Sequence, residues 1–394
     1  MNYELRIMNS PQVAIIGAGA AGCFLGQRLR QLAPQLHVQL YEAHPRPLMK
    51  VAVTGGGRCN LTNSFRQVTD LQHVYPRGHR LMKRLMHQWD QHHTMQWFEQ
   101  QGVPLVTQDD ECVFPVSQDA MQIVHTLQRG LDIRCDYRVQ DPLSLQADYT
   151  VVTTGGSRSF EWLQGTGVQI EPPVPSLFPL RLKPTGLEQL MGLVFDEVTL
   201  TIAGTRLRSH GTLLITHFGV SGPAVLRLSS YAARHLAQQQ YQAPLIVNWL
   251  GDTTFDDALD ELQQLTTQHP DRQLASVLPR LAGARWVTYM IQRSGLAADV
   301  RCKTLTPKHL RRLATQLTAD EYHITGRAPH KEEFVTCGGV SLTSVDSRTL
   351  ECKTHPHLYF AGEVLDLDGI TGGFNLQAAF TTANAIAQAI AAEQ

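Results

Sequence analysis

The chain has 394 residues, more than one compact core usually spans, so two or three domains are expected. Hydrophobic residues make up 43% of the chain and charged residues 18%, which is typical of a globular protein and not of a disordered one. The 34 Lys and Arg residues are balanced by 35 Asp and Glu residues, and this net charge of -1 predicts neither nucleic acid nor a membrane as a partner.

Two features predict a cytoplasmic protein. The N-terminal sequence MNYELRIMNSPQ contains no apolar core of signal-peptide length, and no later segment offers ~18 uninterrupted apolar residues. The seven cysteines form an odd set with no CxxC pair and no zinc-like spacing. We therefore expect reduced thiols, no metal site and no membrane span.

A nucleotide-binding βαβ unit is predicted near the N-terminus. An apolar run at 12–16 is followed by the glycine-rich sequence GAGAAG at 17–22. A helical pattern then covers 23–33, and residues 37–42 alternate as a second strand. This order of strand, turn, helix and strand within about 30 residues is the context that a dinucleotide fingerprint requires.

Each residue type in this fingerprint has a physical reason. Gly17 permits a tight turn, Gly19 lets the backbone approach a pyrophosphate, and Gly22 allows close packing of helix on strand. The N-terminus of the helix would attract the phosphates. Glu42 ends the second strand 20 residues after Gly22, where a carboxylate would bind the ribose hydroxyls.

The rest of the chain changes character near residues 175, 255 and 328. In order, the sequence predicts a mostly polar helix at 76–101, a strand at 147–156 that runs into glycines, a proline-rich crossing between domains from Pro172, several strands at 178–250 with a helix near 222–238, short helices at 255–319, strands at 332–342 and 357–363, and a final helix from Asn375.

A second glycine-rich loop, TGGGRCNLTN at 54–63, follows the βαβ unit. Its three successive glycines would let the backbone lie flat against a planar or phosphate-bearing ligand. Polar contacts would come from Arg58, Asn60, Thr62 and Asn63. The alternative is a flexible surface loop. Lys50, just upstream, lies either near phosphates or in solvent.

Two glycine clusters occur late in the chain, AGE at 361–363 and TGGFNLQ at 371–377. The second would direct the N-terminus of the helix beginning near Asn375 at whatever lies before it. The positive end of a helix stabilises an electron-rich flavin carbonyl or a reduced anionic flavin.

Several weaker signals have bland alternatives. GVSGP at 219–223 only superficially resembles a hydrolase elbow, and Ser221 is better interpreted as the N-cap of the following helix. His217 either faces a cavity next to a flavin or is a buried structural histidine. A redox role for Cys59 is disfavoured because it has no resolving partner. A basic run at helical spacing is either a solvated face or an attractor of anionic substrate; it comprises Arg77, Arg80, Lys83 and Arg84.

The GAGAAG, GGGRCNLTN, THFGVSGPAVL, FVTCGGVSL and GEVLDLDGITGGFNLQAAF segments together resemble the HI0933-like flavoproteins, members of the glutathione-reductase-type FAD superfamily. The resemblance runs nearly end to end. It implies an α/β fold, with a split Rossmann-like FAD-binding domain at 10–175 and 328–394, a β-barrel-like insert at 176–254 and a small helical domain at 255–327.

The same resemblance places FAD against a set of residues in both halves of the split domain. They are Gly17, Gly19, Ala20, Ala21, Gly22, Glu42, Ala43, Lys50, Gly55, Gly56, Gly57, Arg58, Cys59, Asn60, Thr62, Asn63, Thr154, Gly155, Gly156, Gly362, Glu363, Asp366, Gly372, Gly373, Phe374, Asn375, Leu376 and Gln377. One segment departs from the family: after TGG at 154–156 the loop SRSFEWLQGTG is shorter. We therefore expect a distinct subfamily in which substrate access or identity differs.

The expected function is an FAD-dependent oxidoreductase that transfers hydride between flavin N5 and a small organic substrate. No second GxGxxG lies in residues 151–250, so NAD(P)H would bind only transiently, or the electrons would come from the substrate and pass to oxygen or a carrier. An NAD(P)H-linked reductase is favoured. The alternatives are an oxidase, a flavin-dependent RNA-modifying enzyme and a non-catalytic flavin-binding protein. The related proteins include a reductase of unsaturated steroid ketones and aminoacetone oxidases, so the family does not define the substrate.

Overall fold

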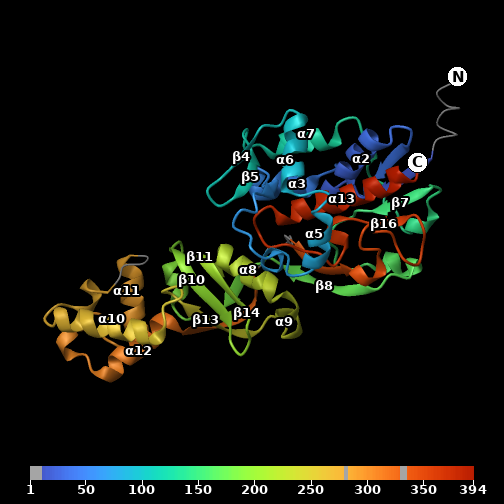
Figure 1. The fold of residues 1–394 in the computed structure, drawn as a ribbon. Helices are drawn as coiled ribbons and strands as arrows, with labels where there is room; N and C mark the ends of the chain where they lie inside the picture. Colours follow the sequence, from blue (N-terminus) through green and yellow to red (C-terminus); the bar gives the residue numbers. More distant parts are fainter. Residues whose placement is uncertain (1–10, 279–282, 329–334) are drawn as a thin grey trace, which may run out of the picture. The chain divides into compact units, whose positions relative to one another are not determined.

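The computed structural model describes residues 11–278, 283–328 and 335–394. The chain divides into two compact units, Met1–Val174 with Val335–Gln394, and Pro175–Phe334 (Figure 1). The second unit contains both strands and short helices, so the boundary expected near residue 255 stays a prediction. No helix in these described ranges is long and apolar enough to span a lipid bilayer.

The first unit is built on a five-stranded sheet of parallel strands in the order β16-β7-β1-β2-β6. The strands are β1 (Gln12–Ile16), β2 (His37–Tyr41), β6 (Asp132–Arg134), β7 (Tyr149–Val152) and β16 (Leu358–Phe360). Leu358 pairs with Thr150, so the C-terminal segment adds the strand next to β7. The sheet therefore needs both ends of the chain.

Helix α13 (Phe374–Ala392) packs against α2 (Ala20–Leu32), and the ring centroids of Phe24 and Phe380 lie 4.9 Å apart. Most of α13 is buried, including its polar residues Thr381 and Thr382. A helix that is buried on nearly all sides belongs to the core and is not a surface cover.

Smaller elements complete the first unit. They are α3 (Met49–Gly57), α4 (Leu71–Val74), α5 (His79–Leu85), α6 (Gln91–Gln100), α7 (Ala120–Gln128), a small sheet of β3 (Thr62–Asn63), β5 (Cys112–Pro115) and β4 (Leu105–Thr107), and a ribbon of β8 (Ile170–Ser176) and β15 (Val335–Val340).

One expectation for this unit needs correction and another is refined. The single helix expected at 76–101 is two helices, because Asp90 and His93 form a capping box that starts α6 anew. The proline-rich stretch does cross between the units, which divide at Val174 and Pro175, and its first part forms strand β8, since prolines are tolerated in a two-stranded ribbon where few backbone N–H groups are needed. Residues 332–334 of the strand expected at 332–342 lie outside the described residues, and β15 begins at Val335.

The second unit contains a closed barrel in the order β10-β11-β12-β9-β14-β13, which leaves no strand edge unpaired around the ring. Its strands are β9 (Leu180–Leu182), β10 (Val194–Ile202), β11 (Arg208–Thr216), β12 (Gly219–Ser221), β13 (Ala243–Asn248) and β14 (Asp320–Arg327), with helices α8 (Pro223–Tyr231) and α9 (Ala233–Gln238) after β12. The small helical domain was expected to extend to residue 327, but residues 320–327 form strand β14 of the barrel.

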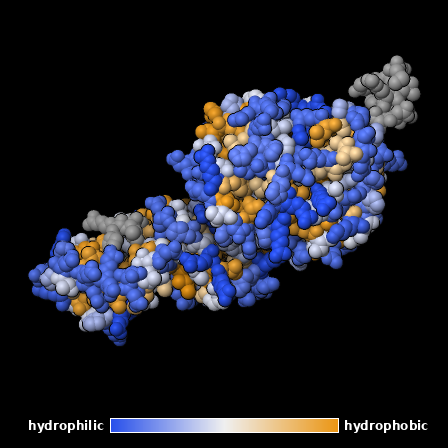
Figure 2. All heavy atoms as spheres, in the orientation of Figure 1, coloured by the Kyte–Doolittle hydropathy of each residue, from blue (hydrophilic) through white to orange (hydrophobic). Residues whose placement is uncertain are grey.

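Three helices form a separate part of the second unit between β13 and β14. They are α10 (Phe255–Gln268), α11 (Ala284–Arg293) and α12 (Pro307–Thr318). The face of these helices that Figure 2 shows is largely hydrophilic. Their apolar side chains share a core with the barrel, since Trp249 contacts both Phe195 of β10 and Trp286 of α11, with ring centroids 4.7 and 6.2 Å apart.

We expect Asp320→Ala to destabilise the second unit strongly. The Asp320 carboxylate is fully buried and accepts hydrogen bonds from Trp249 Nε1 at 3.1 Å, Tyr322 Oη at 2.5 Å and Arg293 Nε at 2.7 Å. Removing it leaves a partly buried guanidinium without its partner, which costs about 3–5 kcal/mol. Urea unfolding measures the loss.

Asp271→Ala is the matched control, because Asp271 pairs with Lys303 at 2.8 Å on the exposed surface. Its unfolding midpoint should stay close to that of the wild-type protein. Equal losses in the two variants would contradict the central role of the buried carboxylate.

Candidate functional site

The fingerprint turn between β1 and α2 is tightly packed at two glycines and open at the third. Gly17 has φ +104°, and a Cβ there would lie 2.7 Å from the Thr153 carbonyl oxygen. A Cβ on Gly22 would lie 2.0 Å from the Gly17 oxygen. At Gly19, by contrast, a Cβ would meet nothing within 4 Å. The turn therefore leaves open space over Gly19, where another group can approach the backbone.

Helix α2 begins at this open space. Gly19 is its N-cap, no side chain of the described residues caps it, and its first turn contains no acidic residue. The first N–H groups and the positive end of the helix dipole are thus available to an anion. Glu42 lies beside the same turn: its two carboxylate oxygens accept from the Ala18 N–H at 2.9 Å and the His44 N–H at 3.0 Å. Ala43 lies between Glu42 and His44 in the chain.

The glycine-rich loop at 54–63 has a backbone that only glycine adopts easily. Gly55, Gly56 and Gly57 have φ of +59°, +69° and +82°, which bends the chain at the end of α3. A Cβ at Gly56 or Gly57 would meet nothing within 4 Å, so this loop also borders open space. Arg58 is exposed, and its guanidinium lies over Phe114, 4.7 Å from the ring centroid.

The C-terminal glycines pack directly on this loop. Gly373 has φ +87°, and a Cβ there would lie 2.3 Å from the Thr62 carbonyl oxygen. With its amide oxygen toward Gly373, the Asn60 side chain accepts from the Gly373 N–H at 3.2 Å and donates to the Thr62 oxygen at 2.9 Å. Asn63 Nδ2 donates to the Gly372 oxygen at 3.2 Å. The two glycine-rich segments predicted separately thus form one structure.

A buried chain of hydrogen bonds extends from this contact. Thr62 Oγ1 donates to Gln377 Oε1 at 2.7 Å, Gln377 Nε2 donates to Thr381 Oγ1 at 3.0 Å, and Thr381 donates to the Trp89 carbonyl oxygen at 2.9 Å. All three side chains are buried. Thr381 was not among the predicted site residues, although it lies one helical turn after Gln377, the spacing at which helical side chains meet.

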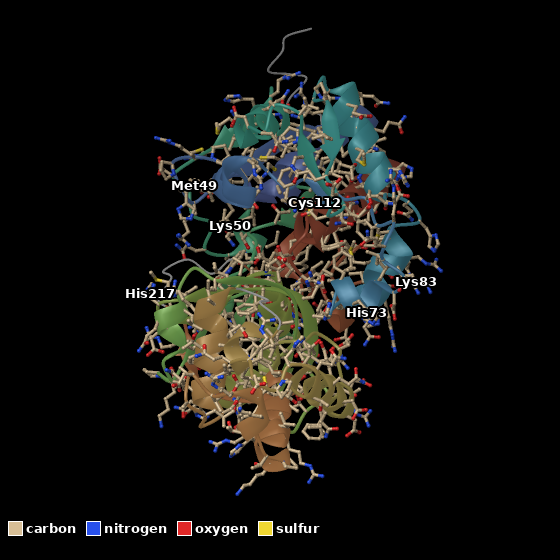
Figure 3. All side chains as sticks on the ribbon, turned by 90° about the vertical axis from the view of Figure 1, so that its left-hand side faces the viewer. Met49, Lys50, His73, Lys83, Cys112 and His217 are labelled. Carbon is tan, nitrogen blue, oxygen red and sulfur yellow. The ribbon has the colours of Figure 1, made fainter. Side chains whose placement is uncertain are left out.

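The Glu363 carboxylate lies close to Lys50 and Gly156, two other predicted site residues. Its Oε1 accepts from the Thr336 N–H at 2.9 Å, and its Oε2 lies 3.4 Å from Lys50 Nζ. The chain continues from β7 through Thr154, Gly155 and Gly156. A Cβ on Gly156 would lie 2.6 Å from Glu363 Oε1, so this turn lies beside the Glu363 carboxylate. The Lys50 side chain is 66% exposed, so its ion pair adds little stability (Figure 3).

The C-terminal segment also contacts helix α2, through Gly362, and its loop before α13 is held by a side chain of α13, that of Asn375. A Cβ on Gly362 would lie 3.0 Å from the Ala21 Cβ. Asn375 does not point into open space: its amide accepts from the Gly369 N–H at 2.8 Å and donates to the Gly369 oxygen at 2.9 Å. The Phe374 ring packs on Phe65, 5.1 Å between centroids. The neighbouring predicted positions are Ala20 in α2, Asp366 in this loop and Leu376 in the first turn of α13.

A buried ion pair between Arg77 and Asp368 was not foreseen. Arg77 Nε lies 2.6 Å from Asp368 Oδ1, Arg77 Nη2 contacts Oδ2, and the Asp368 side chain is fully buried. Arg77 therefore holds the loop before α13 and is not part of a solvated basic face. The two residues are 291 positions apart, and no sequence spacing links them.

Three weaker candidates are resolved by the structure. Ser221 ends β12, and Gly222 is the N-cap of α8, so the N-cap interpretation of Ser221 is wrong. His217 lies exposed in the turn between β11 and β12, so it is not a buried structural histidine (Figure 3). Cys59 is fully buried, which raises its thiol pKa to about 12 and keeps it protonated at neutral pH.

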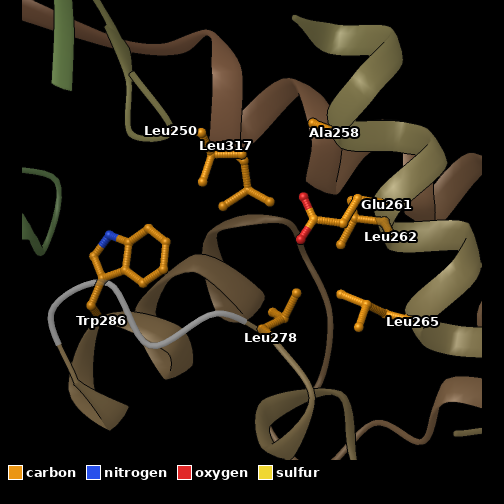
Figure 4. Close-up of a pocket in the computed structure, with 8 residues that line it drawn as sticks. All are labelled: Leu250, Ala258, Glu261, Leu262, Leu265, Leu278, Trp286 and Leu317. Carbon is orange, nitrogen blue, oxygen red and sulfur yellow. The ribbon is translucent and has the colours of Figure 1, made fainter. Parts of the chain in front are cut away.

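A small pocket lies in the second unit, and its lining includes none of the glycine-rich loops or helix starts described above (Figure 4). Its lining residues are Leu250, Ala258, Glu261, Leu262, Leu265, Leu278, Trp286 and Leu317. Apart from Glu261 they are core side chains of the three helices and their connections. We therefore place the candidate site in the first unit.

The parallel sheet, the fingerprint turn and the closed barrel define a Rossmann-type flavoprotein with a barrel insert. The chain belongs to the HI0933-like flavoprotein family: residues 11–148 match the HI0933-like protein Rossmann domain, and residues 174–335 match the HI0933-like protein barrel and H2TH domain. The resemblance, the fold class and the class of flavoprotein oxidoreductase are thereby confirmed. The assignment of individual residues to FAD stays a prediction.

Three curated relatives match nearly the whole chain. "Ribosomal RNA dihydrouridine synthase" of Escherichia coli (strain K12) is 30% identical over 95% of this chain and 96% of its own length. The protein of the same name from Haemophilus influenzae is 27% identical, over 95% and 97%. "3-dehydro-bile acid delta(4,6)-reductase" of Clostridium scindens is 23% identical, over 94% and 97%.

These relatives correct one expectation. The near-zero net charge predicted no nucleic-acid partner, yet two full-length relatives are named for an activity on ribosomal RNA. The prediction was wrong because net charge sums over the whole chain, whereas a nucleic acid contacts only the part of the surface on which basic side chains lie.

Two of the three fingerprint glycines, Gly22 and Gly19, give a matched pair of variants. Gly22→Ala places a Cβ 2.0 Å from a backbone oxygen and should lower the free energy of unfolding by about 1–3 kcal/mol or more. Gly19→Ala meets nothing within 4 Å at an ordinary φ of −83° and should cost less, about 1 kcal/mol or under, because alanine is a poorer N-cap than glycine. Thermal unfolding of the cofactor-free protein compares them. A larger loss at Gly19 would contradict the described turn.

Cys59 should resist alkylation in the folded protein, because burial keeps its thiol inaccessible and protonated. Cys135 is partly exposed and serves as the internal comparison. Iodoacetamide labelling at pH 8 followed by peptide mass spectrometry should modify Cys135 first. Equal labelling of the two thiols would show that the loop at 54–63 opens.

Proposed function

We propose that this protein binds FAD in its first unit and reduces a uracil base of ribosomal RNA to dihydrouracil, with NAD(P)H as the electron donor. The observation that carries the proposal is the match over nearly the full chain to relatives named ribosomal RNA dihydrouridine synthase. The geometry of the first unit supports the cofactor part of it.

The residues around the fingerprint fit a dinucleotide. The uncapped start of α2 offers N–H groups to a pyrophosphate, and the open space over Gly19 leaves room for it. The Glu42 carboxylate is held in place by two backbone N–H groups and has lone pairs left for ribose hydroxyls. The open faces of Gly56 and Gly57 and the uncapped start of α13 would border the flavin part.

Saturation of uracil needs a hydride at C6 and a proton at C5, because the C5=C6 bond is conjugated to the C4 carbonyl. Bound FAD, once reduced, supplies the hydride with its electron pair. The chain contributes orientation and electrostatics: the positive start of α13 favours negative charge near Gly373, and the Thr62–Gln377 chain keeps that helix start in place.

A second candidate is the reduction of a carbon–carbon double bond conjugated to a ketone in a small molecule. The relative named 3-dehydro-bile acid delta(4,6)-reductase favours it. Both reactions saturate a conjugated double bond, so the same cofactor site serves either of them. The relatives named for ribosomal RNA have the higher identity to this chain, and we favour RNA for that reason.

Anaerobic mixing of the purified protein with NADH or NADPH should bleach the flavin band near ~450 nm. Incubation of the reduced protein with unmodified ribosomal RNA transcripts should then yield dihydrouridine, detected by mass spectrometry of the nucleosides. Gly19→Val, whose side chain would occupy the open space, should lose flavin and form no product.

A bleached flavin that reduces an unsaturated 3-ketosteroid but no RNA would replace the first candidate by the second. No bleaching with either nicotinamide would remove NAD(P)H as the donor. A Gly19→Val variant that keeps its flavin would show that the cofactor binds elsewhere.

A further inference from the structure

The charges of the second unit are separated along the chain. Residues 252–271 contain six acidic residues and no Lys or Arg, whereas residues 272–318 contain nine Lys and Arg and one acidic residue, Asp299. The second segment thus has a net charge of +8, in a protein whose total is -1. The acidic segment includes α10, and the basic one includes α11 and α12. The near-neutral total conceals a strongly basic segment.

Helix α12 concentrates exposed cations on one face. Lys308, Arg311 and Arg312 are exposed at spacings of three and four residues, so they share a face of the helix. The opposite face is buried in the core, through Leu310, Leu313, Ala314 and Leu317. The three cations are hereafter called the α12 basic face.

The α12 basic face differs from two other cations of this segment, which pair with carboxylates. Lys303 pairs with Asp271 at 2.8 Å, and Arg293 pairs with Asp320 at 2.7 Å. Within the described ranges, no carboxylate lies within ion-pair distance of Lys308, Arg311 or Arg312. Their charges are therefore available to an external anion.

Helix stability does not account for these charges. Lys308 lies in the first turn of α12, where the helix dipole disfavours a cation, and that turn has no acidic residue. Lys308 and Arg312 are four residues apart, where like charges repel each other. The acidic residues of α10 show the opposite: Asp256 and Asp257 lie in its first turn, where the dipole favours them. A bound polyanion would relieve the repulsion on α12.

We propose that the α12 basic face binds the phosphate backbone of the ribosomal RNA substrate. The inference rests on the proposed function for the choice of RNA, and on the charge and exposure of α12 for the place. Backbone contacts position a nucleic acid and do not read its sequence, so this face supplies affinity and orientation, and the choice of the uridine belongs to other residues.

A triple variant tests the proposal: Lys308→Gln, Arg311→Gln and Arg312→Gln together. The matched control removes three exposed cations from the barrel of the same unit, by Arg181→Gln, Lys183→Gln and Arg206→Gln. Both variants change the net charge equally and leave the buried core untouched. Fluorescence anisotropy with a labelled transcript of a ribosomal RNA domain, titrated at several salt concentrations, measures binding.

The α12 variant should bind on the order of tenfold or more weakly, and its slope of log K against log salt should fall by about 1 for each cation that contacts a phosphate. The barrel control should keep the wild-type slope. An unchanged slope in the α12 variant, or equal losses in the two variants, overturns the proposal. Displacement of the RNA by polyglutamate at equal charge concentration would assign the face to acidic proteins and overturn the choice of RNA.

Two readouts separate failure of this inference from failure of the proposed function. Flavin content and bleaching by NAD(P)H should be unchanged in the α12 variant, because the candidate cofactor residues belong to the first unit. RNA binding that depends on α12 without dihydrouridine formation would reject the proposed function alone. Dihydrouridine formation with an unchanged apparent KM for RNA in the α12 variant would reject this inference alone.

Discussion

The candidate site depends on one close contact, the packing of Gly373 on the backbone of Thr62. A side chain at Gly373 would lie 2.3 Å from the Thr62 oxygen, so the start of α13 approaches the glycine-rich loop as closely as backbones can. The buried Thr62–Gln377 hydrogen bond holds the two segments together, and the Arg77–Asp368 ion pair fixes the loop before α13. Removal of one partner from either pair would leave a buried polar group unsatisfied, and this penalty makes the arrangement specific.

This contact explains why the first unit uses both ends of the chain. Strand β16 pairs with β7 and delivers Gly362 against Ala21, at the start of the fingerprint helix. Two helix starts, those of α2 and α13, then lack side-chain caps in the described structure. Uncapped helix starts are costly when they have no partner, and a bound anionic cofactor would satisfy them.

The second unit contributes a different kind of property. Its barrel has no free strand edge, and its three helices share a core with the barrel through Trp249 and Trp286. Helix α12 packs into this core through one face only, so the side chains on its outer face are not needed for packing. Basic side chains can cluster on one such face while the net charge of the chain stays near zero. The net charge therefore predicted no nucleic-acid partner, although full-length relatives are named for an activity on ribosomal RNA.

The sequence by itself determined the βαβ unit, the glycine positions and several strands of the barrel, because periodicity and glycine requirements are local properties of the backbone. The resemblance of its motifs identified the family. It did not reveal β14, although Asp320, Tyr322 and Ile324 are buried alternately with exposed neighbours, because an aspartate at a strand start seldom belongs to a core. Only the tertiary structure decided that Asn375 holds Gly369 and that Arg77 pairs with Asp368. These contacts join residues whose separation in the chain conveys no signal, and burial alone makes them energetically important.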